Sequence, residues 1–361
     1  MVSIVSAFRD LARIREVSAV LIRHGFGEVV QRIGIGGAGG RRTSDQAEPT
    51  ASGDSRGTVA TRIRQVLEDL GPSFVKLGQL ASTRADLLPP ELVAELRKLQ
   101  DNVPPLPFSD VRDQIERSLG AQVETLFTQF DQTPLAAASI AQVHRARLAD
   151  ENGEHDVAVK VQRPGIGLTI QSDLDILHTL AALLERAIPE TRIYSPIGLV
   201  QQFDHAVTAE LDFAQEADNA GRFTQNFVDH PQVHFPRIYR SASSKQVITM
   251  EYLDGLKFHA ALAQGYPARE LARLAFGAMV KQIYEDGFFH ADPHPGNALV
   301  LGTPEAPVLA MFDLGMVGRL SPRMRDLTID VVMSALRRDY EGIADALYQI
   351  GSPSKKIDRA A

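Results

Sequence analysis

The chain has 361 residues, of which 44% are hydrophobic and 23% charged, so its composition is that of a globular protein that buries a sizeable core. A formal net charge of −7 argues against nucleic acid as the main ligand, and a sequence without cysteine excludes disulfides, thiolate nucleophiles and Cys-ligated zinc. No stretch is apolar over the roughly 18 residues of a membrane-spanning helix, which predicts a cytoplasmic protein, at most peripheral to a membrane. The oligomeric state is left open.

Residues 1–33 predict amphipathic N-terminal helices, because apolar residues recur at helical spacing with arginines between them. The apolar positions are Ile4, Phe8, Leu11, Ile14, Val17 and Leu21. Such a stripe either packs on the rest of the protein or lies on an anionic membrane, and the first alternative is favoured. Residues 34–57, rich in Gly, Ser and Thr, predict a flexible linker. Gly34, Gly36 and Gly39 match the dinucleotide fingerprint, but no helix pattern follows them, so we reject a Rossmann site.

Short helices are predicted over residues 58–120, with Pro90 in the first turn of one of them. The pattern then changes to alternation around Asn152-Gly153, which predicts a β-hairpin. Helical patterns follow at 166–187, 196–228 and 268–286, and candidate strands lie at 233–239 and 246–253. This order of elements predicts an α+β protein.

A polar loop between apolar segments contains His290, Asp292, His294 and Asn297. Asp292 and Asn297 have the spacing D-x-x-x-x-N, and Asp313 follows at the end of the next apolar run. This is the arrangement of phosphoryl-transfer enzymes, in which one aspartate orients the attacking hydroxyl. The asparagine and the second aspartate hold Mg²⁺ against the nucleotide phosphates.

Lys160 lies in the apolar strand pattern VAVKV, which matches the phosphate-binding lysine of kinases. A lysine in such a strand needs a carboxylate nearby to stay charged, and Glu216 on the following helical pattern is the candidate. Glu251 and Tyr252, at the end of the second candidate strand, are assigned to the same ATP/ADP site.

No glycine-rich loop precedes Lys160. An alanine-rich loop stands there instead, formed by Ala136, Ala137, Ala138 and Ser139. Small side chains still let a backbone approach phosphates, but each Cβ removes the access to positive φ that glycine gives. We therefore expect a nucleotide loop of a tighter or different shape.

These motifs together resemble the UbiB/AarF family of atypical, protein-kinase-like proteins over roughly residues 8–350. The resemblance is carried by Lys76-Leu77-Gly78-Gln79, the alanine-rich loop, Glu210-Leu211-Asp212 and the segment His290 to Asn297. It implies a protein-kinase-like bilobal α+β fold with an N-terminal helical extension and a shortened C-lobe. The extension would be residues 58–120, the N-lobe with inserted helices 121–254 and the partial C-lobe 255–361.

The resemblance also implies roles for individual residues. Lys160 would pair with Glu216 and bind phosphates, Asp292 would be catalytic, and Asn297 and Asp313 would bind Mg²⁺. Lys76 and Gln79 would reach over the active site, with Lys76 paired to Glu210 and Asp212 in the same gating set, so that protein substrates are excluded. The implied function is Mg²⁺-dependent ATPase or phosphotransferase activity that supports ubiquinone or other prenyl-lipid metabolism, with quinone precursors and a membrane surface as partners.

The sequence departs from kinases in two further places. Asp313-Leu314-Gly315 replaces Asp-Phe-Gly, and we expect the leucine to fill the same apolar slot. No Ala-Pro-Glu follows Gly315, so the activation segment of a protein kinase is expected to be absent.

Three other functions compete with this one. A nucleotide-binding scaffold would bind ATP without productive transfer. An aminoglycoside- or choline-type phosphotransferase shares the polar loop, although the Lys76–Gln79 motif argues against it. A metal hydrolase would use His290, Asp292 and His294 as ligands, but it leaves Lys160 and Asp313 unexplained.

Overall fold

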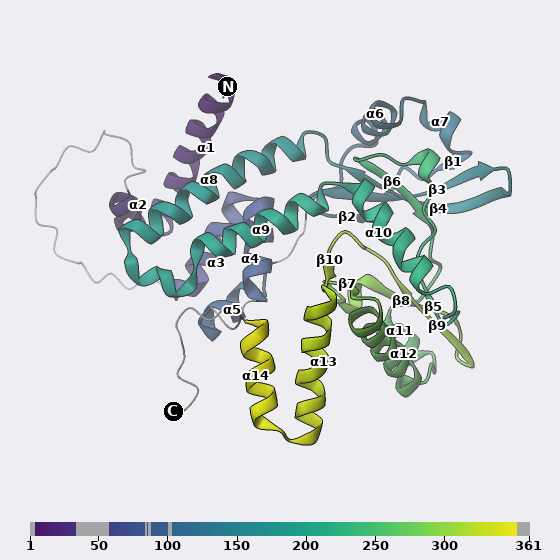
Figure 1. Ribbon diagram of the computed structural model, residues 1–361. Coiled ribbons are helices and arrows are strands. Elements are labelled where there is room, and N and C mark those ends of the chain that lie inside the picture. Colours follow the sequence, from purple (N-terminus) through teal and green to yellow (C-terminus); the bar gives the residue numbers. More distant parts are fainter. Residues whose placement is uncertain (1–3, 34–57, 84, 86–87, 100–102, 352–361) are drawn as a thin grey trace, which may run out of the picture. The chain divides into compact units, whose positions relative to one another are not determined.

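The computed structural model describes residues 4–33, 58–83, 85, 88–99 and 103–351 (Figure 1). The predicted linker and its glycine motif lie outside these ranges. The chain divides into two compact units: residues 1–146 with 159–211 form unit 1, and residues 147–158 with 212–361 form unit 2. The domain boundaries expected from the resemblance remain a prediction.

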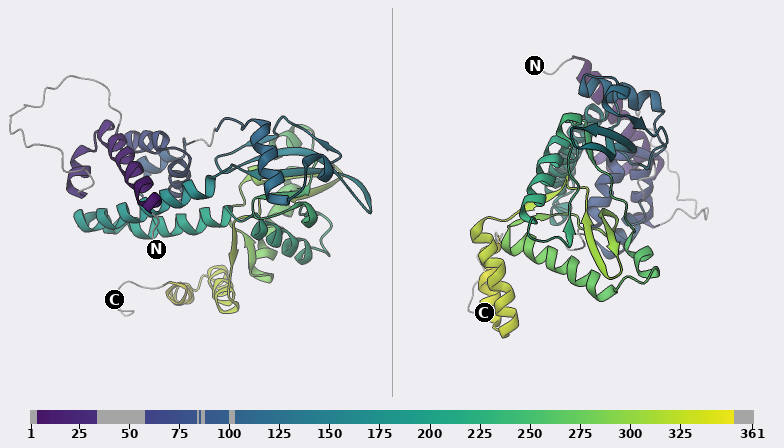
Figure 2. Two further views of the ribbon diagram at one scale, coloured as in Figure 1. Left: turned by 90° about the horizontal axis from the view of Figure 1, so that it is seen from above. Right: turned by 90° about the vertical axis from the view of Figure 1, so that its right-hand side faces the viewer.

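Unit 1 is mainly helical. Its helices are α1 (Ile4–Arg23), α2 (Gly27–Ile33), α3 (Val59–Leu70), α4 (Pro72–Ser82), α5 (Pro90–Leu96), α6 (Phe108–Leu119), α7 (Val123–Leu126), α8 (Ile166–Ala187), η1 (Pro189–Tyr194) and α9 (Pro196–Glu210). Helix starts follow local chemistry: the hydroxyl of Thr58 accepts a hydrogen bond from Thr61 N at the start of α3, and Pro90 occupies the first turn of α5 as predicted. α8 and α9 lie side by side (Figures 1 and 2).

The apolar stripe of α1 packs on the rest of unit 1. Val17 and Val20 are almost fully buried in a core that also contains Leu70, Phe74 and Phe203. For the second half of α1, the packing alternative is therefore confirmed. None of the helices in the described ranges is long and apolar enough to cross a membrane.

The predicted β-hairpin is present, and the boundary between the units crosses it. Its strands are β3 (Ala141–Asp150) and β4 (Gly153–Gln162), and Gly153 takes the positive φ of 119° that the turn requires. In unit 1, β1 (Gln129–Phe130) and β2 (Ala136–Ala137) pair with β3, and Ala136 lies opposite Val143. In unit 2, β6 (Val247–Glu251) pairs with β4.

The remaining elements belong to unit 2. They are α10 (Phe213–Asn226), β5 (Val233–His234), η2 (Arg240–Ala242), α11 (Phe258–Ala263), α12 (Ala268–Val280), the π-helical η3 (Lys281–Glu285), β7 (Phe288–His290), η4 (Pro295–Asn297), β8 (Ala298–Thr303), β9 (Ala306–Met311), β10 (Val317–Arg319), α13 (Pro322–Arg337) and α14 (Tyr340–Ile350). β9 is central to a three-stranded sheet, parallel to β5 and antiparallel to β8, and β7 pairs with β10. Phe223, Phe288 and Leu314 are buried in the core beside this sheet. α13 and α14 form a helical hairpin (Figure 2).

Two sequence-based expectations need correction. The single helix predicted over 196–228 is broken, because the carboxylate of Asp212 accepts a hydrogen bond from Ala214 N at 3.0 Å and starts α10 anew. The candidate strand at 233–239 is shorter than predicted, since Pro236 has no N–H to donate and β5 ends at His234.

Candidate functional site

The predicted catalytic loop lies in unit 2, between β7 and β8. Asn297 Nδ2 donates to the backbone oxygen of Asp292 at 3.1 Å and lies 3.4 Å from its carboxylate, so these two side chains are neighbours. The backbone of the loop is closed by Asn297 N, which donates to His294 O at 2.8 Å. Within the described ranges, Asn297 Oδ1 has no hydrogen-bond partner. The amide oxygen is therefore the atom available to a ligand.

His290 supports the backbone of this loop from within the core, where it is 1% exposed. Nε2 donates to Phe312 O at 3.3 Å, Nδ1 accepts from Asp292 N at 3.2 Å, and the backbone N donates to Gln282 Oε1 at 3.0 Å. Burial lowers the pKa of His290, which agrees with a neutral ring that donates at one nitrogen and accepts at the other.

The metal-hydrolase alternative is not supported by this geometry. Both ring nitrogens of His290 are used for backbone contacts, and His294 Nδ1 accepts from Gly296 N at 3.0 Å. Among residues with described positions, no three His, Cys, Asp or Glu side chains are arranged to hold a metal ion.

Asp313 lies at the same end of the β8–β9 pair as Asn297. Ala298 is paired with Met311, and Phe312 N donates to Asn297 O at 3.0 Å, which brings the residue after Phe312 close to Asn297. Asp313 has a φ of 58°, in the left-handed region that few residues other than glycine adopt. Its side chain is exposed at the end of this pair.

Helix α10 supports the segment that begins with Asp313. Leu314 is 1% exposed and fills the apolar slot as expected, while Asn219 Nδ2 donates to Leu314 O at 2.9 Å. A Cβ placed on Gly315 would lie 3.9 Å from Glu216 Oε2, and Glu216 itself is buried. Unit 2 therefore gathers Asp292, Asn297, Asp313 and Glu216 around one end of β8 and β9.

Glu251 and Tyr252 are engaged with their own unit. Glu251 Oε2 accepts from His234 Nε2 at 2.9 Å and from Arg237 N at 3.1 Å, while Tyr252 N donates to Asp156 O. Burial alone would raise the pKa of Glu251, but the hydrogen bonds from His234 and Arg237 lower it, and the bond to Glu251 raises the pKa of His234. A nucleotide contact at this position would therefore come from the main chain.

In unit 1, the expected contact between Lys76 and Glu210 is present: Lys76 Nζ donates to Glu210 Oε2, which connects α4 to α9. The side chain of Gln79 makes a different contact: its Nε2 donates to Leu99 O at 3.3 Å. Asp212 belongs to unit 2, where it caps α10.

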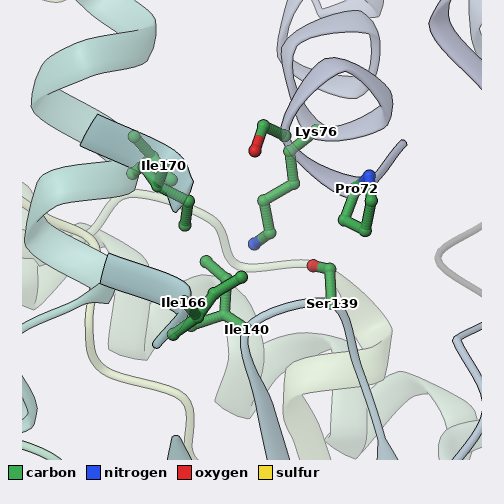
Figure 3. Close-up of a pocket in the computed structure, with 8 residues that line it drawn as sticks. Pro72, Lys76, Ser139, Ile140, Ile166 and Ile170 are labelled. Atoms are coloured by element: carbon green, nitrogen blue, oxygen red, sulfur yellow. The ribbon is translucent and has the colours of Figure 1, made fainter. Parts of the chain in front are cut away.

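Lys76 also borders a small pocket next to the alanine-rich loop (Figure 3). The pocket is lined by Pro72, Ser73, Lys76, Ser139, Ile140, Ile166, Ile170 and Val207. Its volume of about 10 Å³ holds one water molecule at most. In Figure 3 the Lys76 side chain extends toward Ser139, the last residue of the loop. The motif that contains Lys76 therefore lies against the predicted nucleotide loop.

The alanine-rich loop is held by its own backbone and by one arginine. Ala136 and Ala137 form β2, Ala138 N donates to Ala141 O at 2.8 Å, and Arg163 Nε donates to Ala138 O at 2.8 Å. No residue of this loop is among the positive-φ residues of the described chain, as expected for side chains with a Cβ.

Lys160 lies on β4 between the fully buried Val159 and Val161 and is itself half-buried. It belongs to unit 1, whereas Glu216 belongs to unit 2, so their ion pair stays a prediction. The sequence analysis did not identify Gln282, Asn219 or His234 as supports of the site. All three lie inside ordinary helix or strand patterns, and no short motif distinguishes them.

Comparison with known proteins identifies the family. Residues 98–347 match the ABC1 atypical kinase-like domain. The chain belongs to this ABC1 family. Its expected kinase-like fold class and its resemblance to UbiB proteins are thereby confirmed.

Relatives of this ABC1 chain include bacterial and plant proteins. A probable protein kinase UbiB of Aeromonas hydrophila is 37% identical over 97% of this chain and 65% of the relative, and one of Marinobacter nauticus is 40% identical over 80% and 53%. An Arabidopsis thaliana protein named ACTIVITY OF BC1 COMPLEX KINASE 8, chloroplastic, is 37% identical over 82% of this chain and 39% of its own length. The chain thus spans less than two thirds of the length of these relatives.

A solved structure is also similar. It is the complex of Rv3197 from Mycobacterium tuberculosis with erythromycin. The Rv3197 chain matches with a TM-score of 0.54 and 27% sequence identity, and the match covers 83% of this chain and 75% of the Rv3197 chain.

Proposed function

We propose that this ABC1-family protein binds ATP or ADP with Mg²⁺ and acts as a phosphotransferase or ATPase that supports ubiquinone or other prenyl-lipid metabolism. The observation that carries this proposal is the convergence of Asp292, Asn297 and Asp313 at one end of the β8–β9 pair. The names of the UbiB relatives support the metabolic assignment.

The donor set fits Mg²⁺, which prefers hard oxygen ligands and retains several waters. Asn297 Oδ1 and the exposed carboxylate of Asp313 would hold the ion, because the amide nitrogen of Asn297 is already directed at Asp292. When bound, the ion neutralises the charge on the nucleotide phosphates.

Asp292 is the candidate catalytic base. Its carboxylate is exposed, and its backbone is fixed by His290 and Asn297, so it would orient the attacking hydroxyl or water and accept its proton. Lys160 would contact the phosphates, and the main chain of the alanine-rich loop would approach them.

The contact of Lys76 with Glu210, beside Ser139, favours a small acceptor over a protein. We infer that a helix held against the nucleotide loop would hinder a polypeptide from approaching that loop. We therefore expect water or a lipid-soluble quinone precursor as the acceptor.

The test is ATP turnover by the purified protein with Mg²⁺, in the presence and absence of prenyl-phenol analogues and anionic liposomes. We expect phosphate release that the lipid additions stimulate, and about a 10²- to 10⁴-fold lower rate for Asp292→Asn at nearly unchanged nucleotide affinity. Asp330→Asn, an exposed carboxylate on α13, serves as the control. Nucleotide binding without any turnover would favour the scaffold alternative instead.

A further inference from the structure

Helix α13 of unit 2 presents an exposed apolar stripe. Its members, 37–76% exposed, are Ile329, Val332, Met333 and Leu336. Their spacing of i, i+3, i+4 and i+7 places them along one side of the helix, which we call the α13 stripe. Leu327, the buried residue of α13, lies on the other side. With α14, the helix forms a hairpin that extends away from the three-stranded sheet of unit 2 (Figures 1 and 2). An exposed apolar stripe rimmed by polar residues marks an interaction surface.

Charged residues follow one flank of the α13 stripe. Asp326, Asp330 and Arg337 are spaced i, i+4 and i+11, so they lie in one row beside the apolar side chains. All three are exposed, and none has an ion-pair partner among the residues that the structure describes. Asp326 and Asp330 repel each other, since like charges at i, i+4 destabilise a helix. A positive charge placed between them would relieve this repulsion.

The stripe and its charged flank are complementary to a second copy of themselves in antiparallel orientation. With a two-fold axis between Val332 and Met333, Ile329 of one copy lies opposite Leu336 of the other. In an antiparallel pair of helices related in this way, the same flank of each copy faces the other. Arg337 then comes opposite position 328, between the two aspartates of the second copy, and symmetry repeats the contact.

Other partners fit this surface less well. A parallel pair would bring opposite flanks together, and the second flank, with Thr328 and Ala335, is uncharged. An anionic membrane would meet two carboxylates and one arginine beside the stripe, and these carboxylates would be repelled. We propose that the α13 stripe is a dimer interface, at which two copies of this chain pack antiparallel with Arg337 of each between the aspartates of the other.

Sedimentation velocity of the full chain at increasing protein concentration measures this association. We expect the mass to rise from that of one chain to twice that mass. Leu336→Glu should raise the dissociation constant about tenfold or more, because it places an unpaired charge in the apolar interface. Val228→Glu is the matched control and should leave the constant unchanged, since Val228 is 76% exposed, like Leu336, but lies outside α13. Thermal unfolding would check that both variants fold.

Reversal of charge tests the flank. Arg337→Glu should weaken the dimer about tenfold, because it would gather three carboxylates at each end of the interface. Adding Asp326→Lys and Asp330→Lys to this variant reverses every charge of the row and should restore the dissociation constant to within about threefold of the original. Asp330→Asn, which leaves the nucleotide site intact, should weaken the dimer about two- to threefold at unchanged ATP turnover. Assembly and phosphoryl chemistry are thus tested independently.

The orientation can be tested by cross-linking, because the sequence contains no cysteine that would compete. Val332→Cys lies next to the two-fold axis and should form a disulfide between copies under mild oxidation. Leu336→Cys should not, because its two copies would be about 10 Å apart along the helix axis. A disulfide that forms as readily at position 336 as at position 332 would refute the antiparallel arrangement.

Two further results would overturn the proposal. One is a single-chain mass at all concentrations, or a dimer that Leu336→Glu leaves intact. The other is a monomeric chain that sediments with vesicles of phosphatidylcholine and phosphatidylglycerol and no longer does so as Leu336→Glu, which would assign the α13 stripe to a membrane.

Discussion

Asp313 combines an unusual backbone conformation with an exposed carboxylate, and both matter for its proposed role. Its φ of 58° lies where asparagine and aspartate are more tolerated than other side chains, so Asp313→Asn should keep the fold. Without the charge, the ion should bind much more weakly. We expect the Mg²⁺-dependent part of the thermal shift produced by ATP or ADP to disappear. A shift that still depends on Mg²⁺ would refute the assignment of Asp313 as a ligand.

The His234–Glu251 pair should make stability depend on pH, because the pKa of His234 is raised above 6.5 and that of Glu251 lowered below 4.5. The contribution of His234 is complete below 6.5 and is lost as pH rises through its folded-state pKa. That of Glu251 is complete above 4.5 and is lost as pH falls through its own folded-state pKa. The pair therefore stabilises the folded state most between pH 4.5 and pH 6.5, the ordinary pKa values of the two side chains.

Urea unfolding of the unaltered chain and of His234→Gln at pH 6 and pH 9 would measure this effect. We expect the difference in unfolding free energy to be larger at pH 6, since the imidazolium is then charged. The neighbouring Arg237 stays charged at both values and does not contribute to the change. In a Glu251→Gln background only the burial of the ring still acts on His234, and burial lowers its pKa, so the difference should no longer be larger at pH 6. A difference that was still larger at pH 6 in that background would assign the effect to another group.

At the scale of elements, the packing of α4 depends on Gly78. A Cβ at this position would lie 2.3 Å from Leu99 Cδ1 and 2.7 Å from Leu67 Cδ1, in contact with a buried cluster. Gly78→Ala should therefore destabilise unit 1 by about 1–3 kcal/mol, in spite of the better helix propensity of alanine.

The control for this substitution is Gly277→Ala, also inside a helix but with open space around the added Cβ. It should be neutral or stabilise by up to about 1 kcal/mol. Chemical denaturation of both variants would test the contrast, and equal effects would show that α4 has room to shift.

The contact between Lys76 and Glu210 joins α4 to α9 across a long sequence separation. The two side chains are 22% and 27% exposed, so each partner left alone would be partly desolvated. Lys76→Ala and Glu210→Ala should each cost on the order of 1–3 kcal/mol, and the double variant should cost less than their sum. Lys98→Ala, whose side chain is 60% exposed, should change stability by less than about 0.5 kcal/mol. Strictly additive effects would make the contact energetically irrelevant.

For the molecule as a whole, the stretch between Gly315 and α13, all of it described by the structure, is too short for a kinase activation segment. β10 begins at Val317 and pairs with β7, and α13 begins at Pro322. A peptide-binding platform of the kinase type is therefore not formed by this stretch. We expect no transfer of labelled phosphate from ATP to generic peptides or casein, while phosphate release continues. Peptide phosphorylation as fast as ATP hydrolysis would contradict this.

The resemblance to the UbiB/AarF family predicted contacts between motif residues, but it did not predict the residues that support them. It led to the contact of Lys76 with Glu210, which the structure contains. It did not indicate that Asn219 supports Leu314, or that Glu251 is occupied by His234. Motifs contain the residues that touch ligands, whereas supporting residues vary with the local packing.

Features that depend on residues close together in the chain follow from the amino-acid sequence alone. The 166–187 helix, the hairpin around Asn152-Gly153 and the loop from Asp292 to Asn297 were predicted because periodicity, turn chemistry and spacing act over a few positions. Even at this scale, one capping carboxylate, Asp212, was enough to break a predicted helix.

Which distant groups meet, and which ionisable groups are buried, follows from the tertiary packing. Asn297 comes close to Asp313 because β8 and β9 are antiparallel. The pKa of His290 is lowered because the surrounding core excludes water from it. Burial and charge compensation are sums over all neighbours in space, and the linear order of residues does not contain those neighbours.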